Sequence, residues 1–109
     1  MYVEEKKLGE TDLDNVGKIL LEAADYIERH GWCQHVASNA KGEVCAMGAI
    51  NACSTLVGNG NFAARERVCE YLSKYLFGSL PALAVEVWND APGRTKEEVV
   101  VALRSAARS

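Results

Sequence analysis

Apolar residues recur at intervals of three and four along most of this chain, and the intervals stop at glycine, asparagine and proline. The first such stretch runs from Leu13 to Ile27, and Gly31 follows it as a residue suited to ending a helix. This spacing places apolar side chains on one face of an α-helix. It predicts a mainly α fold, a compact single-domain bundle of about five helices, over residues 12–30, 45–57, 62–76, 80–88 and 95 onward.

The remaining segments lack a helical period. Residues 1–10 are polar and mixed in charge, so we expect a loose N-terminal arm, followed by a single helical domain over residues 11–109. Residues 34–45 contain turn residues from Asn39 to Gly42, which fits either a short β-hairpin or an irregular loop. Small residues between positions 46 and 52 favour close packing, and they predict that the helix over 45–57 is the central one.

Two local patterns mark the last turn and the last helix. Pro92 and Gly93 are the residue pair that a type II turn favours. Thr95 is followed three residues later by Glu98, which is the spacing of a capping box at the start of a helix. Pro81 is expected in the first turn of the helix over 80–88, where a proline is tolerated.

Length and charge limit the classes of function. The chain has 109 residues, enough for one domain, and 12 basic against 15 acidic residues give a net charge of -3. Nucleic-acid-binding domains usually carry a basic patch, so nucleic acid is not an expected partner. The first residues have no signal-peptide pattern, and no apolar run approaches the ~20 residues of a membrane span. A cytoplasmic location without a membrane is expected.

Cysteine and histidine could in principle supply a metal site or a nucleophile. His30, Cys33 and His35 are close in sequence, but Cys45, Cys53 and Cys69 are single and widely spaced, unlike the close pairs of zinc sites. We therefore predict no metal, no cofactor and four reduced cysteines that act as small buried apolar residues. The Cys33–His35 pair does not indicate a nucleophile, and no phosphate-binding glycine loop is present, so an enzyme is not expected.

The most distinctive segments combine aromatic, amide and charged residues at turns. Their candidate binding residues are Trp32, Gln34, Asn89, Asp90 and Arg94. Tryptophan and arginine are favoured anchors at protein interfaces, so these residues could form a recognition surface. A structural role is the alternative, in which the tryptophans fill the core, Asn89 or Asp90 caps a helix, and Arg94 pairs with Asp90.

The same segments resemble a family of small uncharacterised proteins from actinobacteria and their phages. The resemblance covers residues 18–107 and rests on five blocks, Leu20–Ile27, Gly31–Gln34, Val44–Ile50, Trp88–Asp90 and Gly93–Val99. It implies a bacterial cytoplasm, including that of a phage-infected cell, and it carries no catalytic residue. Residues 57–62 match least.

The absence of a catalytic or cofactor pattern favours a non-enzymatic module that binds another protein, and a phage-encoded modulator of a host process is one form of it. Whether the chain forms a homo-oligomer remains open. The alternative is a small-molecule or nucleotide-binding domain whose polar, aromatic pocket is lined by the five candidate residues.

Overall fold

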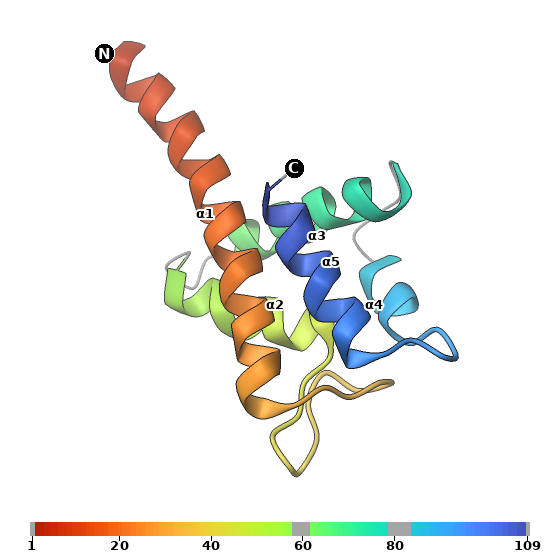
Figure 1. The fold of residues 1–109 in the computed structure, drawn as a ribbon. Coiled ribbons are helices and arrows are strands. Elements are labelled where there is room, and N and C mark those ends of the chain that lie inside the picture. Colours follow the sequence, from red (N-terminus) through yellow and green to blue (C-terminus); the bar gives the residue numbers. More distant parts are fainter. Residues whose placement is uncertain (1, 58–61, 79–83, 109) are drawn as a thin grey trace.

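The computed structural model describes the backbone of residues 2–57, 62–78 and 84–108, and the side chains of residues 15–54, 65–78 and 85–108. Within these ranges the chain forms five α-helices and no strand, which confirms the mainly α prediction (Figure 1). The helices are α1 (Tyr2–His30), α2 (Ala46–Val57), α3 (Phe62–Phe77), α4 (Ala84–Asn89) and α5 (Lys96–Arg108).

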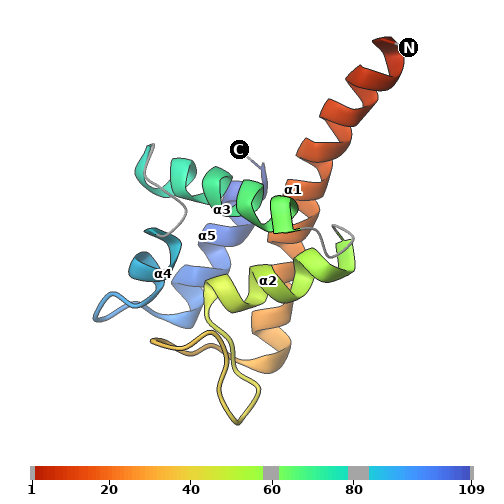
Figure 2. The same ribbon diagram turned by 180° about the vertical axis from the view of Figure 1, so that it is seen from behind.

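Helix α1 begins at Tyr2, ten residues before the predicted start. Glu4, Glu5, Lys6 and Lys7 are all good helix formers, although they carry no apolar pattern. The N-terminal part of α1 projects away from the other helices (Figures 1 and 2). At its other end, Gly31 adopts a φ of 98° and donates its N–H to the carbonyl of Ile27 at 2.8 Å, which ends the helix as predicted.

Helix α1, rather than α2, is the centre of the bundle. It packs against α5, α2 and α3, and α5 runs antiparallel to it (Figures 1 and 2). The small residues of α2 do permit close packing, since Ala46 and Ala49 are completely buried. Helix α1 is central because it supplies more completely buried core residues than α2, namely Ile19, Leu20, Ala23, Ala24 and Ile27.

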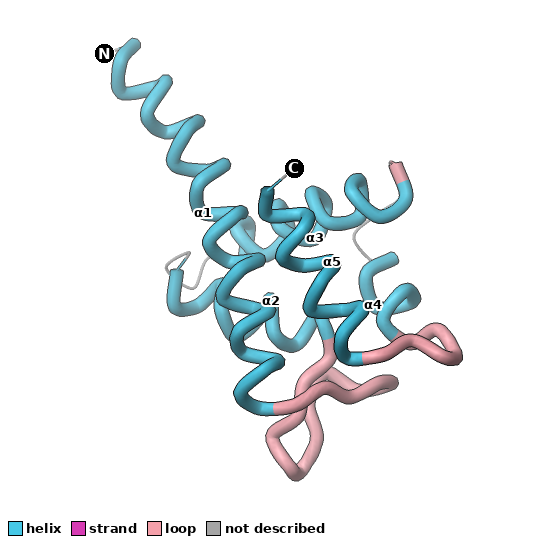
Figure 3. Tube along the Cα trace, in the orientation of Figure 1, coloured by secondary structure: helices cyan, strands magenta, loops and turns pink. Residues whose placement is uncertain are grey.

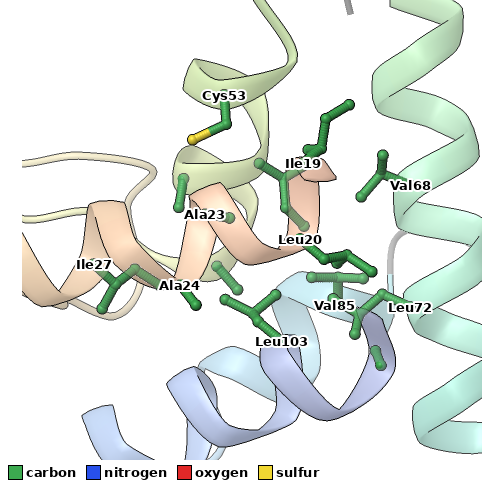
Figure 4. Packing of buried hydrophobic residues seen from close by; sticks show 14 of the residues in the cluster. Ile19, Leu20, Ala23, Ala24, Ile27, Cys53, Val68, Leu72, Val85 and Leu103 are labelled. Carbon is green, nitrogen blue, oxygen red and sulfur yellow. The ribbon is translucent and has the colours of Figure 1, made fainter. Parts of the chain in front are cut away.

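The core is formed by aliphatic side chains from all five helices, and six of them come from α1. Figure 4 shows part of this cluster. Burial of each large aliphatic side chain stabilises the fold by roughly 1.5–3 kcal/mol relative to exposure. The completely buried residues shown there include Ile19, Leu20, Ala23, Ala24, Ile27, Val68, Leu72 and Val85.

Residues 31–45 form an irregular loop instead of a hairpin. Only two isolated β-bridges occur in the loop, joining Val44 to Trp32 in parallel and to Ser38 in antiparallel orientation. The loop and the connection between α4 and α5 lie at the same end of the bundle (Figure 3). The parallel pairing of Trp32 and Val44 does not continue as a ladder, because the side chain of Asn89 from α4 binds both the Cys33 carbonyl and the Ala46 N–H.

The start of α5 follows the predictions. Thr95 and Glu98 exchange two hydrogen bonds, from Thr95 N to Glu98 Oε1 at 3.0 Å and from Glu98 N to Thr95 Oγ1 at 3.1 Å. The turn before it closes from Arg94 N to the carbonyl of Ala91 at 3.1 Å, and Gly93 has the positive φ of a type II turn, 84°. The predicted position of Pro81 lies outside the described residues.

Candidate functional site

Helix α4 directs one amide side chain into the interior. Val85 and Asn89 lie four residues apart on the same face of this short helix, and both are completely buried. Val87 lies on the opposite face and is 69% exposed. The polar Asn89 takes the buried position because a full set of hydrogen-bond partners surrounds it.

The Asn89 side chain makes four hydrogen bonds, two with each end of its amide. Oδ1 accepts from the indole N–H of Trp32 at 2.7 Å and from the backbone N–H of Ala46 at 3.0 Å. Nδ2 donates to the carbonyl of Cys33 at 3.2 Å and to the Asp90 carboxylate at 2.9 Å. An amide has two donor hydrogens and two acceptor lone pairs, so Asn89 uses its full capacity.

Two side chains cap the start of α2. Its first helical N–H, from Ala46, is bound by Asn89, although Asn89 is distant in sequence. The N–H of Gly48 donates to the Cys45 sulfur at 3.3 Å, so this cysteine takes the place that serine or threonine usually fills before a helix. The prediction that Asn89 caps a helix is therefore confirmed, but the capped end belongs to α2.

Gln34 and Asp90 attach the loop to the end of α4. The Gln34 amide donates to the carbonyls of Asn89 at 3.1 Å and Ala91 at 3.0 Å. Asp90 Oδ1 accepts the backbone N–H of His35 at 2.9 Å, and this contact accompanies a φ of 76° at His35, an uncommon conformation for a residue with a side chain. The hydrogen bond from the His35 N–H lowers the pKa of Asp90 below its usual value.

Arg94 contacts Trp88 and Glu98. Its Nε donates to the Trp88 carbonyl at 3.0 Å, and its guanidinium lies 4.2 Å from the centre of the Trp88 ring. Its ion-pair partner is Glu98, at 3.7 Å, and not Asp90 as the structural interpretation of the sequence proposed. The reason is geometric, since the Asp90 carboxylate faces the loop on its other side, with His35 Nδ1 4.0 Å away.

The structure thus connects four of the five candidate residues, Trp32, Gln34, Asn89 and Asp90, by hydrogen bonds. Arg94 lies next to this network through Trp88. Sequence reasoning missed Cys45 and His35 as members. Cys45 carried a usable signal, because it directly precedes a predicted helix, whereas nothing in the sequence marked the His35 N–H as the partner of Asp90.

A pocket of about 150 Å³ lies elsewhere, between α1 and α5. Its charged side chains bind one another: Arg104 contacts Asp25 at 3.0 Å and Glu28 at 3.5 Å, while Lys96 contacts Glu28 at 3.8 Å. These exposed pairs connect α1 to α5 and add little stability. Three of the four charged residues on the wall, Glu28, Lys96 and Arg104, are engaged in these pairs, so this pocket is not the candidate site.

Histidine, cysteine and acidic side chains are the possible metal ligands. In the described part of the chain, no three histidine, cysteine or acidic side chains converge as metal ligands do. The thiol of Cys33 donates towards the carbonyls of Val36 and Glu43, both at 3.5 Å, and His30 stacks on Tyr26 with ring centres 4.2 Å apart. Among the described helices, none has the length and apolar character needed to cross a bilayer.

Fold and site together define a mainly α domain in which a buried asparagine joins a loop, a short helix and the start of α2. The chain belongs to a family of unknown function, DUF6197, whose model matches residues 12–109. The resemblance to a family of uncharacterised proteins is confirmed at that level. No curated protein matches the chain, and no solved structure does.

Proposed function

We propose that this chain is a non-enzymatic protein-interaction module. The observation that carries the proposal is how the candidate polar groups are used: Asn89 is completely buried with four hydrogen bonds, and the Gln34 amide binds two backbone carbonyls. A small molecule or nucleotide would have to displace bonds that hold the loop, α4 and α2 together. The alternative of a ligand pocket is for this reason less well supported.

Apolar side chains remain exposed beside this network. Val87 is 69% exposed on α4 and Val36 is 51% exposed on the loop, while Tyr75 and Phe77 are exposed near the end of α3. We call these four residues the apolar edge. Helix α3 contacts α4, and the hydrogen bond between His35 and Asp90 holds the loop against the end of α4.

The network gives the apolar edge a fixed shape. Val87 lies between the buried Val85 and Asn89, so α4 cannot rotate to hide it without breaking the hydrogen bonds of Asn89. A rigid apolar surface costs little conformational entropy on binding, which favours association with another protein. The net charge of -3 is poorly suited to nucleic acid and compatible with a protein partner.

The resemblance to proteins of actinobacteria and their phages supports a setting for this module. In that setting it acts in the bacterial cytoplasm, and its partner is a host protein whose activity is modulated during phage infection. Self-association through the same edge is the competing form of this function.

Matched valine substitutions test the proposal. Wild type, Val87→Lys and Val101→Lys would each be used to capture proteins from an actinobacterial lysate. Val101 is 61% exposed on α5, so its substitution adds the same charge at a comparable exposure away from the apolar edge. We expect one protein to be retained by wild type and Val101→Lys and lost with Val87→Lys, with all three variants melting at similar temperatures.

The control outcomes are distinct. Equal capture by all three variants would contradict the proposal, since the apolar edge would not contribute to binding. Sedimentation of the purified chain would show self-association, and Val87→Lys should abolish it if the partner is a second copy. A small molecule that binds wild type and Val87→Lys equally, but not Trp32→Phe, would favour the ligand-pocket alternative.

A further inference from the structure

Two cysteines from distant parts of the loop lie next to each other in backbone register. The parallel bridge between Trp32 and Val44 is closed by two hydrogen bonds of 3.0 Å, from Val44 N to the Gly31 carbonyl and from Cys33 N to the Val44 carbonyl. In a parallel pair, the residues that follow a bridged pair again lie opposite each other, and the side chains of an opposed pair point to the same face. Cys33 and Cys45 are therefore the next opposed pair.

The Asn89 amide takes the place of the next hydrogen bond of this ladder. Continuation of the pairing would require Ala46 N to donate to the Cys33 carbonyl. Instead, Ala46 N donates to Asn89 Oδ1 at 3.0 Å, and Asn89 Nδ2 donates to the Cys33 carbonyl at 3.2 Å. The inserted amide fixes the distance between the two segments from both sides, so the cysteines are held in place on a defined framework.

The spacing of this framework suits a disulfide. At the Trp32–Val44 bridge, one residue before the two cysteines, the segments have the hydrogen bonds of neighbouring strands, which lie about 4.8 Å apart. Disulfides join residues whose Cα atoms are about 4.4–6.8 Å apart. The two thiols also interact electrostatically, since burial and the nearby Cys45 both raise the pKa of Cys33.

The two thiols differ in solvent access, so Cys33 is the thiol that reacts first and Cys45 the one that reacts second. Cys33 is half-buried, whereas Cys45 is buried at the start of α2. The other two cysteines lie in the core, where burial raises the pKa of Cys53 to about 11 and that of Cys69 to about 12. A thiolate is the reactive form of cysteine, so those two are unreactive at neutral pH.

We propose that Cys33 and Cys45 form a modification site, a dithiol that a low-molecular-weight disulfide oxidises to an intramolecular disulfide. The Cys33 thiolate attacks the disulfide RSSR, a mixed disulfide forms, and one thiolate RS⁻ leaves. The Cys45 thiolate then attacks the Cys33 sulfur and displaces the second RS⁻. The protein loses two electrons and two protons, and RSSR becomes two RSH.

This site has a predictable pH dependence. Burial raises the pKa of both thiols above the usual value of 9.0, so only a small fraction of each is thiolate at neutral pH. The exchange is therefore slow at neutral pH and accelerates as the pH rises towards the pKa. The nearby acidic residues act in the same direction as burial, since Glu43 and Asp90 raise the pKa of Cys33, and Asp90 and Glu86 raise that of Cys45.

The test uses the full chain and glutathione disulfide. After incubation at a mildly alkaline pH, free thiols are alkylated under denaturing conditions and the digest is analysed by mass spectrometry. We expect a cross-linked Cys33–Cys45 peptide, two hydrogens lighter than its reduced parts, with Cys53 and Cys69 alkylated. The same incubation with glutathione disulfide in concentrated urea should give at least ten-fold less of this cross-link, because the backbone register is lost.

Serine variants complete the test. Cys33→Ser should abolish the cross-link, and the double variant Cys53→Ser/Cys69→Ser should retain it. Cys45→Ser keeps a side chain that can cap α2, and it should leave Cys33 as a mixed disulfide with glutathione. The proposal would be overturned by a folded chain that gives only that mixed disulfide in the wild type, by a Cys33 link to Cys53 or Cys69, or by equal cross-linking in urea.

Discussion

The side chain of Asn89 hydrogen-bonds the N–H of Ala46 and thereby connects the last residue of α4 to the first residue of α2. The two helices are far apart in sequence, and no disulfide joins them. Because the same oxygen also binds the Trp32 indole, one amide holds the loop and two helices in a single arrangement.

The first prediction concerns Asn89 itself. Asn89→Ala would leave the Trp32 and Ala46 N–H groups and the Cys33 carbonyl without their partner, and an unsatisfied buried group costs about 1–3 kcal/mol. We expect the free energy of unfolding to fall by about 3–5 kcal/mol in urea titrations. Trp32→Phe removes one donor and should cost about 1 kcal/mol. Equal, small losses in both variants would show that the network contributes little.

A pair of glycine substitutions distinguishes helix propensity from packing. Alanine is favoured over glycine within a helix by about 1 kcal/mol. At Gly17 on α1 an added Cβ would lie 3.6 Å from the Ala107 carbonyl, an ordinary contact, so Gly17→Ala should be neutral or stabilising.

At Gly48 the added Cβ would overlap the carbonyl oxygen of Ala37, which is backbone and cannot move aside alone. We expect Gly48→Ala to lose about 2 kcal/mol or more in spite of its better propensity. The measurement is the melting temperature of both variants. A stabilised Gly48→Ala would mean that the loop is not packed on α2.

Arg94 provides a test of its contact with Trp88. The guanidinium donates to the Trp88 carbonyl and covers the ring, and its side chain is only 22% exposed. We expect Arg94→Ala to cost about 1–2 kcal/mol and Arg94→Lys about half as much, since lysine retains the charge without the planar fork. Trp88 fluorescence should change in both. Unchanged stability and emission would show that Arg94 is freely presented to a partner.

Asp90 contributes a pH-dependent stabilisation. Hydrogen bonding lowers its pKa in the folded chain, so the folded state binds fewer protons than the unfolded state as pH falls. The contribution is complete above the ordinary value of 3.8 and is lost as pH drops through the lower folded pKa.

Because the Asp90 side chain is 32% exposed, the contribution should stay below about 1 kcal/mol. Asp90→Asn should therefore be less stable than wild type at neutral pH, and the gap should narrow in acid. Urea titrations at both pH values check this. A constant gap would assign the effect to packing.

The sequence by itself determined the helices and their ends. Periodic apolar residues located α1, α2, α3 and α5, while Gly31, Pro92–Gly93 and the Thr95–Glu98 pair placed boundaries that local hydrogen bonds confirm. These signals depend on a few neighbouring residues, so they can be read from the sequence without knowledge of the fold. They did not mark the first ten residues of α1, where good helix formers carry no apolar pattern.

Only the tertiary structure decided what the polar residues do. The sequence singled out Trp32, Gln34, Asn89, Asp90 and Arg94, but it could not distinguish a ligand pocket from an internal network, because the partners lie more than 40 residues apart. It could not pair Arg94 with Glu98, and it could not distinguish a hairpin from the irregular loop that residues 31–45 form. Hydrogen bonds between distant segments depend on how α4 approaches the loop, and helix packing alone sets that approach.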